Sequence, residues 1–362
     1  MERAALNARG NAFLNAPEDG ATGSAYSHHR VAAAGGKAPR WKRRLLYAGR
    51  LLFLGSALGI LAWRLAGDGM GTLEAVQKIG LAAVLGSFLA AAAGVGASGL
   101  AWRSLLRGLG APLDRRAAAR VFFTGQIGKY IPGTVWAYVA HAKLGREHGV
   151  PASRTTAASV LFVVAHTATG AVVAGLVLPF ASGDVSDRFG WIALLAPLLL
   201  ASLHPQLVLP VLRLVHRVVG RGIPPEVVSG PAVLRALGWL AVTWLGYGTS
   251  MLLLLRPVAR ADTHALLPVA LGGFALAWTV GFIAAGVLVV TPAGLGVREV
   301  ALLMVLGPVV AGGGAAAAVV LLSRMVHTLS DAAWALVGIG LRAPQKSGGE
   351  SGSAHDPEPV SR

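Results

Sequence analysis

The sequence predicts an all-α polytopic membrane protein with about seven to eight transmembrane segments, one or two of them broken or re-entrant. Of the 362 residues, 54% are hydrophobic and 13% are charged, and the mean hydropathy is +0.62. These values are typical of membrane proteins. The formal net charge of +16 comes from basic residues in tails and short loops beside apolar segments, as the positive-inside rule describes. Two apolar stretches are also interrupted by proline and glycine.

Composition and motifs exclude several classes of protein. The basic residues flank apolar segments, which suits anionic lipid headgroups, so we expect no nucleic-acid partner. The chain has no cysteine, which excludes disulfides, thiolate catalysis and zinc-thiolate sites. No His-Glu-x-x-His, Gly-x-Ser-x-Gly or Walker A motif and no ligand-spaced His, Asp and Glu cluster occurs. We therefore expect no enzyme activity, no metal and no cofactor.

Three regions are predicted along the chain. Residues 1–44 lack apolar periodicity and end in a Lys and Arg cluster, so they form a disordered basic tail. The same cluster places the N-terminus in the cytoplasm of a multi-pass protein of the plasma membrane. Residues 45–341 form the membrane domain, and residues 342–362 form a second disordered tail.

Long apolar segments make up most of the membrane domain. They are predicted at about residues 45–66, 79–102, 155–180, 191–212, 233–255, 266–290 and 315–341, with lengths that can cross a bilayer. A polar loop with Glu74 and Lys78 is expected before the second of them. That second segment contains Gly-Val-Gly-Ala-Ser-Gly, the spacing of a dinucleotide fingerprint, but no strand precedes it. Close packing of membrane helices through small residues is the better interpretation.

The first interruption lies inside residues 121–140, where Gly125, Gly128 and Pro132-Gly133 break an apolar run. Such breaks are tolerated at membrane depth where protein or a water-filled cavity covers the freed backbone groups. Basic residues flank the run on both sides, which places both flanks in the cytoplasm. The stretch is therefore predicted to be a re-entrant hairpin that lines a polar cavity.

The second interruption lies at residues 291–299, before a short apolar run at 300–310. That run is too short for an untilted crossing, so it is either a second re-entrant helix or a short tilted one. One broken helix in each half of the chain points to an inverted repeat with its binding site at the repeat interface.

Ionisable residues inside membrane segments are functional candidates because burying charge in lipid costs free energy. The candidate substrate-binding residues are Gln126, Lys129, Tyr130, Pro132, Gly133, Trp136, Pro292, Gly294, Gly296, Arg298, Glu299, Arg324, His327 and Asp331. The last three of these, at spacings of three and four, share one helix face. Trp136 also fits an interfacial anchor. His166 stands alone in its segment, and a satisfied packing role is expected for it.

Two interpretations of these charges remain open. Lys129, Arg298 and Arg324, with helix N-termini exposed at the breaks, would hold an anionic phosphate. Glu299 and Asp331 would then balance those charges or receive a cationic headgroup. Alternatively, the same side chains pair with one another only to fasten helices together.

Residues 128–136 (GKYIPGTVW) and 292–299 (PAGLGVRE) together resemble the two signature stretches of the lysylphosphatidylglycerol synthase transmembrane-region family of flippase-like proteins. The resemblance covers about residues 45–341 in order and hydropathy. It implies a bacterial or archaeal membrane domain with a lipid-translocating site at residues 129–136 and 292–299. Only a short polar stretch follows residue 341, so the soluble aminoacyl-transferase domain of some members is not expected here.

The leading functional hypothesis is a lipid flippase that moves a phospholipid or an aminoacyl-phospholipid between leaflets. The alternative is a non-transporting accessory subunit, which presents lipid or polyprenyl-phosphate substrate to a separate synthase or glycosyltransferase. A third hypothesis, a membrane glycosyltransferase, needs a catalytic carboxylate beside metal ligands. The acidic loop residues form no such cluster. The expected partners are therefore a membrane phospholipid and, in the alternative, a separate enzyme.

Overall fold

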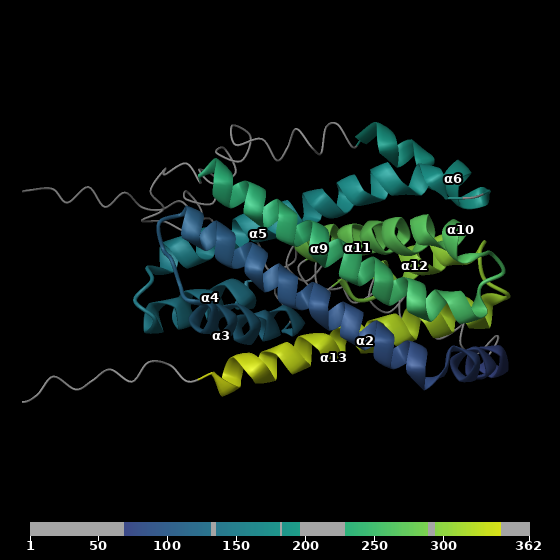
Figure 1. The fold of residues 1–362 in the computed structure, drawn as a ribbon, viewed down its shortest axis with the longest axis horizontal. Helices are drawn as coiled ribbons and strands as arrows, with labels where there is room; N and C mark the ends of the chain where they lie inside the picture. Colours follow the sequence, from purple (N-terminus) through teal and green to yellow (C-terminus); the bar gives the residue numbers. More distant parts are fainter. Residues whose placement is uncertain (1–68, 132–134, 182, 196–228, 289–293, 342–362) are drawn as a thin grey trace, which may run out of the picture. The chain divides into compact units, whose positions relative to one another are not determined.

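The computed structural model describes residues 69–131, 135–181, 183–195, 229–288 and 294–341, all within one compact unit, Leu46–Arg362 (Figure 1). Within these ranges the chain is helical, and its only β-type pairing is an isolated bridge between Ala259 and Val310. Five helical stretches are long and apolar enough to cross a membrane: Gly69–Gly108, Ala152–Phe180, Gly230–Val258, Thr263–Ala285 and Gly313–Gly340. The predicted all-α polytopic membrane fold is confirmed.

The described elements are α2 (Gly69–Gly108), α3 (Arg115–Gln126), η1 (Ile127–Tyr130), α4 (Trp136–Glu147), α5 (Ala152–Val177), η2 (Leu178–Phe180), α6 (Asp184–Phe189), η3 (Gly190–Leu195), α9 (Gly230–Leu255), η4 (Arg256–Val258), α10 (Thr263–Pro268), η5 (Val269–Gly273), α11 (Phe274–Leu288), α12 (Val297–Leu306) and α13 (Gly313–Gly340). The predicted segment 45–66, most of segment 191–212 and both tails lie outside the described residues.

Helix α2 is longer than the sequence predicts. The stretch with Glu74 and Lys78, expected to be a loop, is helical, so that expectation is wrong. The helix kinks at Gly80, whose φ of 72° and ψ of 162° are not helical. The residues buried before the kink are Thr72, Ala75 and Ile79. Their spacing of three and four gives this turn an apolar face, which explains why it folds as helix.

Helices α2 and α9 pack closely along small residues, and the glycine-rich run of α2 lies at this interface. A Cβ added to Gly94 would lie 2.8 Å from the Tyr247 ring. A Cβ added to Gly246 of α9 would lie 2.9 Å from the Cα of Gly94. The hydroxyls of Ser87 and Ser250 hydrogen-bond across the same interface at 2.8 Å. The run is therefore a helix-packing surface and not a dinucleotide fingerprint.

Helices α3 and α4 form the predicted hairpin, and they lie side by side (Figure 1). Away from the tip, Arg120 in the middle of α3 approaches Glu147, the last residue of α4, with 3.9 Å between nitrogen and oxygen. At the tip, Gly128 lies so close to α4 that an added Cβ would be 2.5 Å from the Ala137 nitrogen. The chain therefore enters and leaves this element at the same end. Pro132-Gly133 lies outside the described residues.

The predicted segment 266–290 is one irregular path made of α10, the π-helical turn η5 and α11. Pro268 has no N–H to donate, and η5 begins at the next residue. Gly272 then lets Leu178 approach, since an added Cβ would lie 2.9 Å from the Leu178 side chain.

The short helix after the second interruption is α12, which has ten residues and is shorter than the candidate spans. Its following turn is joined to the end of η4: the Arg260 N–H donates to the Val309 carbonyl at 3.1 Å, beside the Ala259–Val310 bridge. Both sequence interpretations of this helix, re-entrant or tilted, remain compatible with its length.

Candidate functional site

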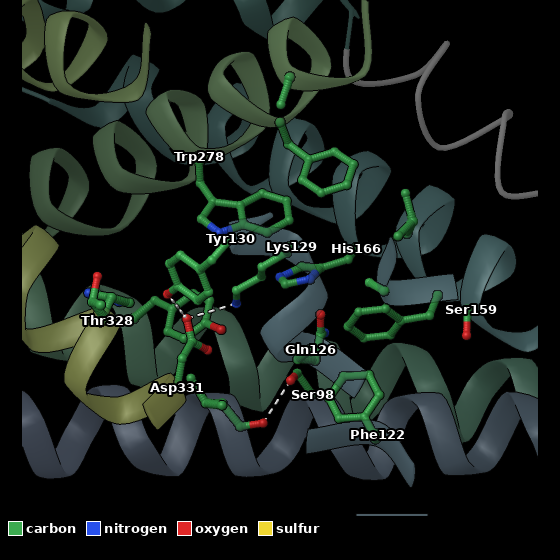
Figure 2. Close-up of a pocket in the computed structure, with 18 of the residues that line it drawn as sticks. Ser98, Phe122, Gln126, Lys129, Tyr130, Ser159, His166, Trp278, Thr328 and Asp331 are labelled. Carbon is green, nitrogen blue, oxygen red and sulfur yellow. Dashed lines mark hydrogen bonds and ion pairs between the residues drawn. The ribbon is translucent and has the colours of Figure 1, made fainter. Parts of the chain in front are cut away.

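A cavity of about 140 Å³ is lined by residues of both interrupted regions. The first interruption contributes Gln126, Lys129 and Tyr130, and α12 contributes Arg298. Helix α13 supplies its polar face, and α5, α9 and α11 supply mainly aromatic side chains. In Figure 2, Lys129, Tyr130, His166 and Trp278 converge on one space. The structure thus brings together two stretches that are about half the chain apart in sequence.

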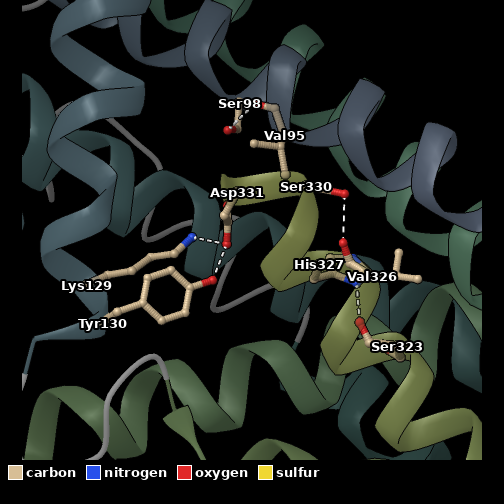
Figure 3. Close-up of polar contacts among 9 residues, drawn as sticks. All are labelled: Val95, Ser98, Lys129, Tyr130, Ser323, Val326, His327, Ser330 and Asp331. Atoms are coloured by element: carbon tan, nitrogen blue, oxygen red, sulfur yellow. Dashed lines mark hydrogen bonds and ion pairs between the residues drawn. The ribbon is translucent and has the colours of Figure 1, made fainter. Parts of the chain in front are cut away.

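The first charged group of the cavity is the trio Lys129, Tyr130 and Asp331 (Figures 2 and 3). The Lys129 Nζ lies 2.7 Å from Asp331 Oδ2. The Tyr130 hydroxyl donates to the same oxygen at 2.6 Å. The pair is partly covered, with side-chain exposures of 33% for the lysine and 15% for the aspartate. The positive charge of Lys129 is therefore already balanced by a residue of α13.

The second charged group joins α13 to α12. Arg324 Nη1 donates to Glu299 Oε1 at 3.2 Å. The other carboxylate oxygen of Glu299 accepts the Gly296 N–H at 2.6 Å, at the start of α12. The expectation that this helix N-terminus is open to a phosphate is wrong, because a carboxylate already occupies the positive end of the helix.

Arg298 differs from the other two cations. Its side chain is 7% exposed, and its Nη2 has no hydrogen-bond partner. It makes no ion pair within the described residues. Its guanidinium carbon lies 4.7 Å from the centre of the Phe274 ring, a cation–π contact. Buried donors without partners are rare in proteins, so Arg298 is the cation of the cavity that has a donor to offer.

Two buried histidines also face the cavity with one unpartnered nitrogen each. His327 is 6% exposed, and its Nδ1 lies 2.9 Å from the Ser323 carbonyl, while its Nε2 has no partner (Figure 3). His166 stacks on Trp278 with 4.1 Å between ring centres, and its Nε2 is also unpartnered. The expectation that His166 packs against its neighbours is confirmed by its aromatic contacts, but the expectation that it is satisfied is wrong for Nε2.

The stretch that carries both interruptions and the cavity matches a known protein family. The family model described as lysylphosphatidylglycerol synthase TM region matches residues 47–335. The chain belongs to this family. The match includes both interruptions and all of the cavity-lining residues. A search of the curated proteins finds no match. The resemblance inferred from residues 128–136 and 292–299 is thereby confirmed at the level of the family.

Membership in the lysylphosphatidylglycerol synthase TM region family, together with the five apolar stretches, identifies a multi-pass integral membrane protein. The sequence-predicted candidates that line the cavity are Gln126, Lys129, Tyr130, Arg298, Arg324, His327 and Asp331. Glu299 reaches the site through Arg324. Trp136 is 47% exposed and does not line the cavity. Pro132, Gly133 and Pro292 lie outside the described residues.

The two glycine candidates position α12 and do not line the cavity. Gly294 and Gly296 have φ values of 71° and 92°, which residues with a Cβ rarely adopt. A Cβ on Gly294 would also lie 2.6 Å from the Gly281 carbonyl oxygen of α11. These glycines therefore let the chain turn tightly into the helix that carries Arg298.

Several lining residues carry no sequence signal that separates them from packing residues. Tyr247, Trp278 and Phe282 are aromatic residues in apolar helices, where such side chains usually pack against neighbours. Their contribution follows from tertiary packing: Trp278 stacks on Phe282 at 5.1 Å and His166 meets Trp244 at 5.0 Å. For His166 the available signal was an ionisable group within a span.

A second polar network supports the hairpin, and three of its members, Phe122, His141 and Ser159, line the cavity. The Ser159 hydroxyl accepts from Trp102 Nε1 at 3.0 Å and contacts His141 Nδ1 at 2.8 Å. The other imidazole nitrogen of His141 lies 3.1 Å from the Phe122 carbonyl. The network thus connects α2, α5 and both arms of the hairpin.

Replacing Ser159 by alanine is expected to lower the free energy of unfolding by about 2 kcal/mol, because two buried groups lose their partner. Thermal unfolding of the purified protein in detergent measures the change. Ser104→Ala is the matched control, since the Ser104 hydroxyl donates within its own helix, to the Leu100 carbonyl, and has no other hydrogen bond among the described residues. An equal effect of the two substitutions would contradict a supporting role for the network.

Proposed function

We propose that this protein moves a phospholipid or an aminoacyl-phospholipid between the leaflets of the plasma membrane, with its N-terminus in the cytoplasm. The observation that carries the proposal is the unpartnered, buried Arg298 in a cavity shared by both interrupted regions. Lipid phosphate is the acceptor that membrane proteins most readily meet at such a group. Discontinuous helices that meet at a polar site are also typical of transporters.

The position of the cavity along the helices supports movement across the bilayer. Arg324, His327 and Asp331 lie in the middle part of α13, which is itself a candidate span. His166 lies in the middle part of α5, another candidate span. A headgroup bound there would be near the midplane, about halfway between the two surfaces.

The hairpin arm α4 offers a boundary between headgroup and acyl chains. Its residues Ala137 and Tyr138 line the cavity. Val139, the next residue, and Val135, two residues before Ala137, are 54% and 58% exposed. A lipid can therefore keep its chains against the apolar outer face while its headgroup occupies the cavity, which is the arrangement that translocation requires.

Reconstitution into liposomes tests the proposal. We expect the wild-type protein to exchange labelled phosphatidylglycerol or its lysyl derivative between leaflets. Arg298→Gln should slow this exchange by at least about tenfold, since a charge-assisted hydrogen bond to the phosphate is lost. Arg256→Gln is the matched control, because Arg256 is exposed and does not line the cavity. Equal exchange in empty and protein-containing vesicles across several lipids would contradict translocation.

The alternative is an accessory subunit that presents lipid or polyprenyl phosphate to a separate synthase or glycosyltransferase. The two ion pairs that connect α13 with both interruptions favour it, because they would stabilise a fixed binding site. Lipid binding that depends on Arg298, without leaflet exchange, is the result that this alternative predicts.

A further inference from the structure

The charges around the cavity do not cancel. Lys129 is paired with Asp331, and Arg324 is paired with Glu299. Arg298 is left without an ion-pair partner in the part of the chain that the structure describes. With neutral imidazoles, this group of side chains carries one excess positive charge. A ligand with one negative charge would balance it, and a ligand with an added ammonium group would not.

The carboxylates are also committed to other partners. Asp331 Oδ2 receives both Lys129 and the Tyr130 hydroxyl. The two oxygens of Glu299 receive Arg324 and the Gly296 N–H. A cationic headgroup would have to displace one of these contacts before it could pair with Glu299, and at Asp331 it would share the carboxylate with the Lys129 ammonium. Both carboxylates therefore balance cations of this chain, which was one of the two roles that the sequence suggested for Glu299 and Asp331.

His327 adds a hydrogen-bond acceptor beside the anion position. A carbonyl oxygen can only accept, so the contact with Ser323 requires a proton on Nδ1 of His327. In the neutral ring, Nε2 is then an acceptor, and it is buried without a donor. The His327 ring stacks on Phe274 at 4.7 Å, and the Arg298 guanidinium lies 4.7 Å from the same ring centre. Both residues therefore contact the same aromatic ring, and both line the cavity.

We propose that the cavity selects a lipid phosphodiester whose headgroup carries a hydroxyl and no amine, with Arg298 binding the phosphate and His327 Nε2 accepting from the hydroxyl. The inference rests on the proposed function, because the selected lipid is the one to be moved. It narrows that function to unmodified anionic lipids and disfavours aminoacylated ones. Trp278 and His166, which stack on each other and line the cavity, add aromatic side chains for contact with the rest of the headgroup.

Native mass spectrometry of the full chain in detergent tests the selection with three phosphodiester lipids of matched acyl chains. Phosphatidylglycerol has the hydroxylated headgroup, phosphatidylmethanol lacks the hydroxyl, and lysylphosphatidylglycerol adds ammonium groups. We expect phosphatidylglycerol to bind about threefold to tenfold more tightly than phosphatidylmethanol, the size of one hydrogen bond. We expect phosphatidylglycerol to bind at least about fivefold more tightly than lysylphosphatidylglycerol.

The variants assign these preferences to residues. Arg298→Gln should weaken binding of phosphatidylglycerol and phosphatidylmethanol alike, by at least about tenfold. His327→Phe keeps the ring shape and should abolish only the difference between those two lipids. Arg256→Gln, at an exposed position, should change neither the binding of these lipids nor the difference between them. Circular dichroism of each variant checks that the helices remain folded.

Three results would each overturn the inference: equal or tighter binding of lysylphosphatidylglycerol, equal binding of phosphatidylglycerol and phosphatidylmethanol, or full binding by a folded Arg298→Gln variant. Leaflet exchange, measured separately in vesicles, distinguishes this failure from failure of the proposed function. Exchange without selectivity contradicts the inference alone, and selective binding without exchange contradicts transport alone.

Discussion

Asp331→Ala is expected to lower the free energy of unfolding by about 3 kcal/mol, because it leaves the Lys129 ammonium inside the cavity without a carboxylate. The Tyr130 hydroxyl loses its acceptor in the same substitution. Thermal or denaturant unfolding in detergent measures the change. The cost is larger than that of a surface ion pair because both side chains are mostly covered, at 33% and 15% exposure.

A double-mutant cycle with Lys129→Ala separates pairing from general damage. In the double variant no uncompensated charge remains, so much of the lost stability should return. Simple addition of the two single effects would show that Lys129 and Asp331 do not depend on each other, and would contradict the pairing. The exposed pair Arg188 and Asp184, 3.9 Å apart on α6, provides the matched cycle, for which a coupling near zero is expected.

The second large effect is expected at Gly281 of α11, which contacts the backbone of α12. A Cβ there would lie 2.8 Å from the Arg298 Cβ and 3.3 Å from its backbone nitrogen and Cα. Gly281→Ala should therefore push α12 away, cost about 1–3 kcal/mol of stability and withdraw Arg298 from the cavity. Unfolding measurements and the lipid-binding assay report the two consequences separately.

Gly238 of α9 is the matched control for Gly281, because a Cβ there would meet nothing within 4 Å. Gly238→Ala should leave lipid binding unchanged and stabilise the helix by up to about 1 kcal/mol, since alanine has the higher helix propensity. The two glycine substitutions would thus change the free energy of unfolding in opposite directions. Unchanged stability and binding in Gly281→Ala would contradict the close contact between α11 and α12.

Much of the site could be predicted from local sequence. The charges of Arg324, His327 and Asp331 recur at helical spacing, so their shared face follows from the geometry of one helix. The hairpin at residues 121–140 follows from its glycines and from the basic residues on both flanks. The cavity confirms that these stretches meet, because Lys129 and Arg298 both line it.

The pairing of the charges could not be predicted in the same way. Lys129 and Arg298 are both cations beside a break, yet one is paired and the other is not. That difference depends on which residues of α13 face each break, and no local pattern encodes it. The π-helical turn η5 could not be predicted either, because a change in a few backbone hydrogen bonds does not alter the hydropathy of the sequence. The aromatic lining from Tyr247 and Trp278 also depends on tertiary packing alone.

Asp331 and Arg324 lie two helical turns apart on the same side of α13, and their partners come from opposite halves of the chain. A rotation of α13 about its own axis would carry both side chains away from their partners together. Because both side chains share one face, a rotation large enough to break one ion pair also displaces the other. The charge pattern of this single helix therefore makes the two halves respond to its rotation in synchrony.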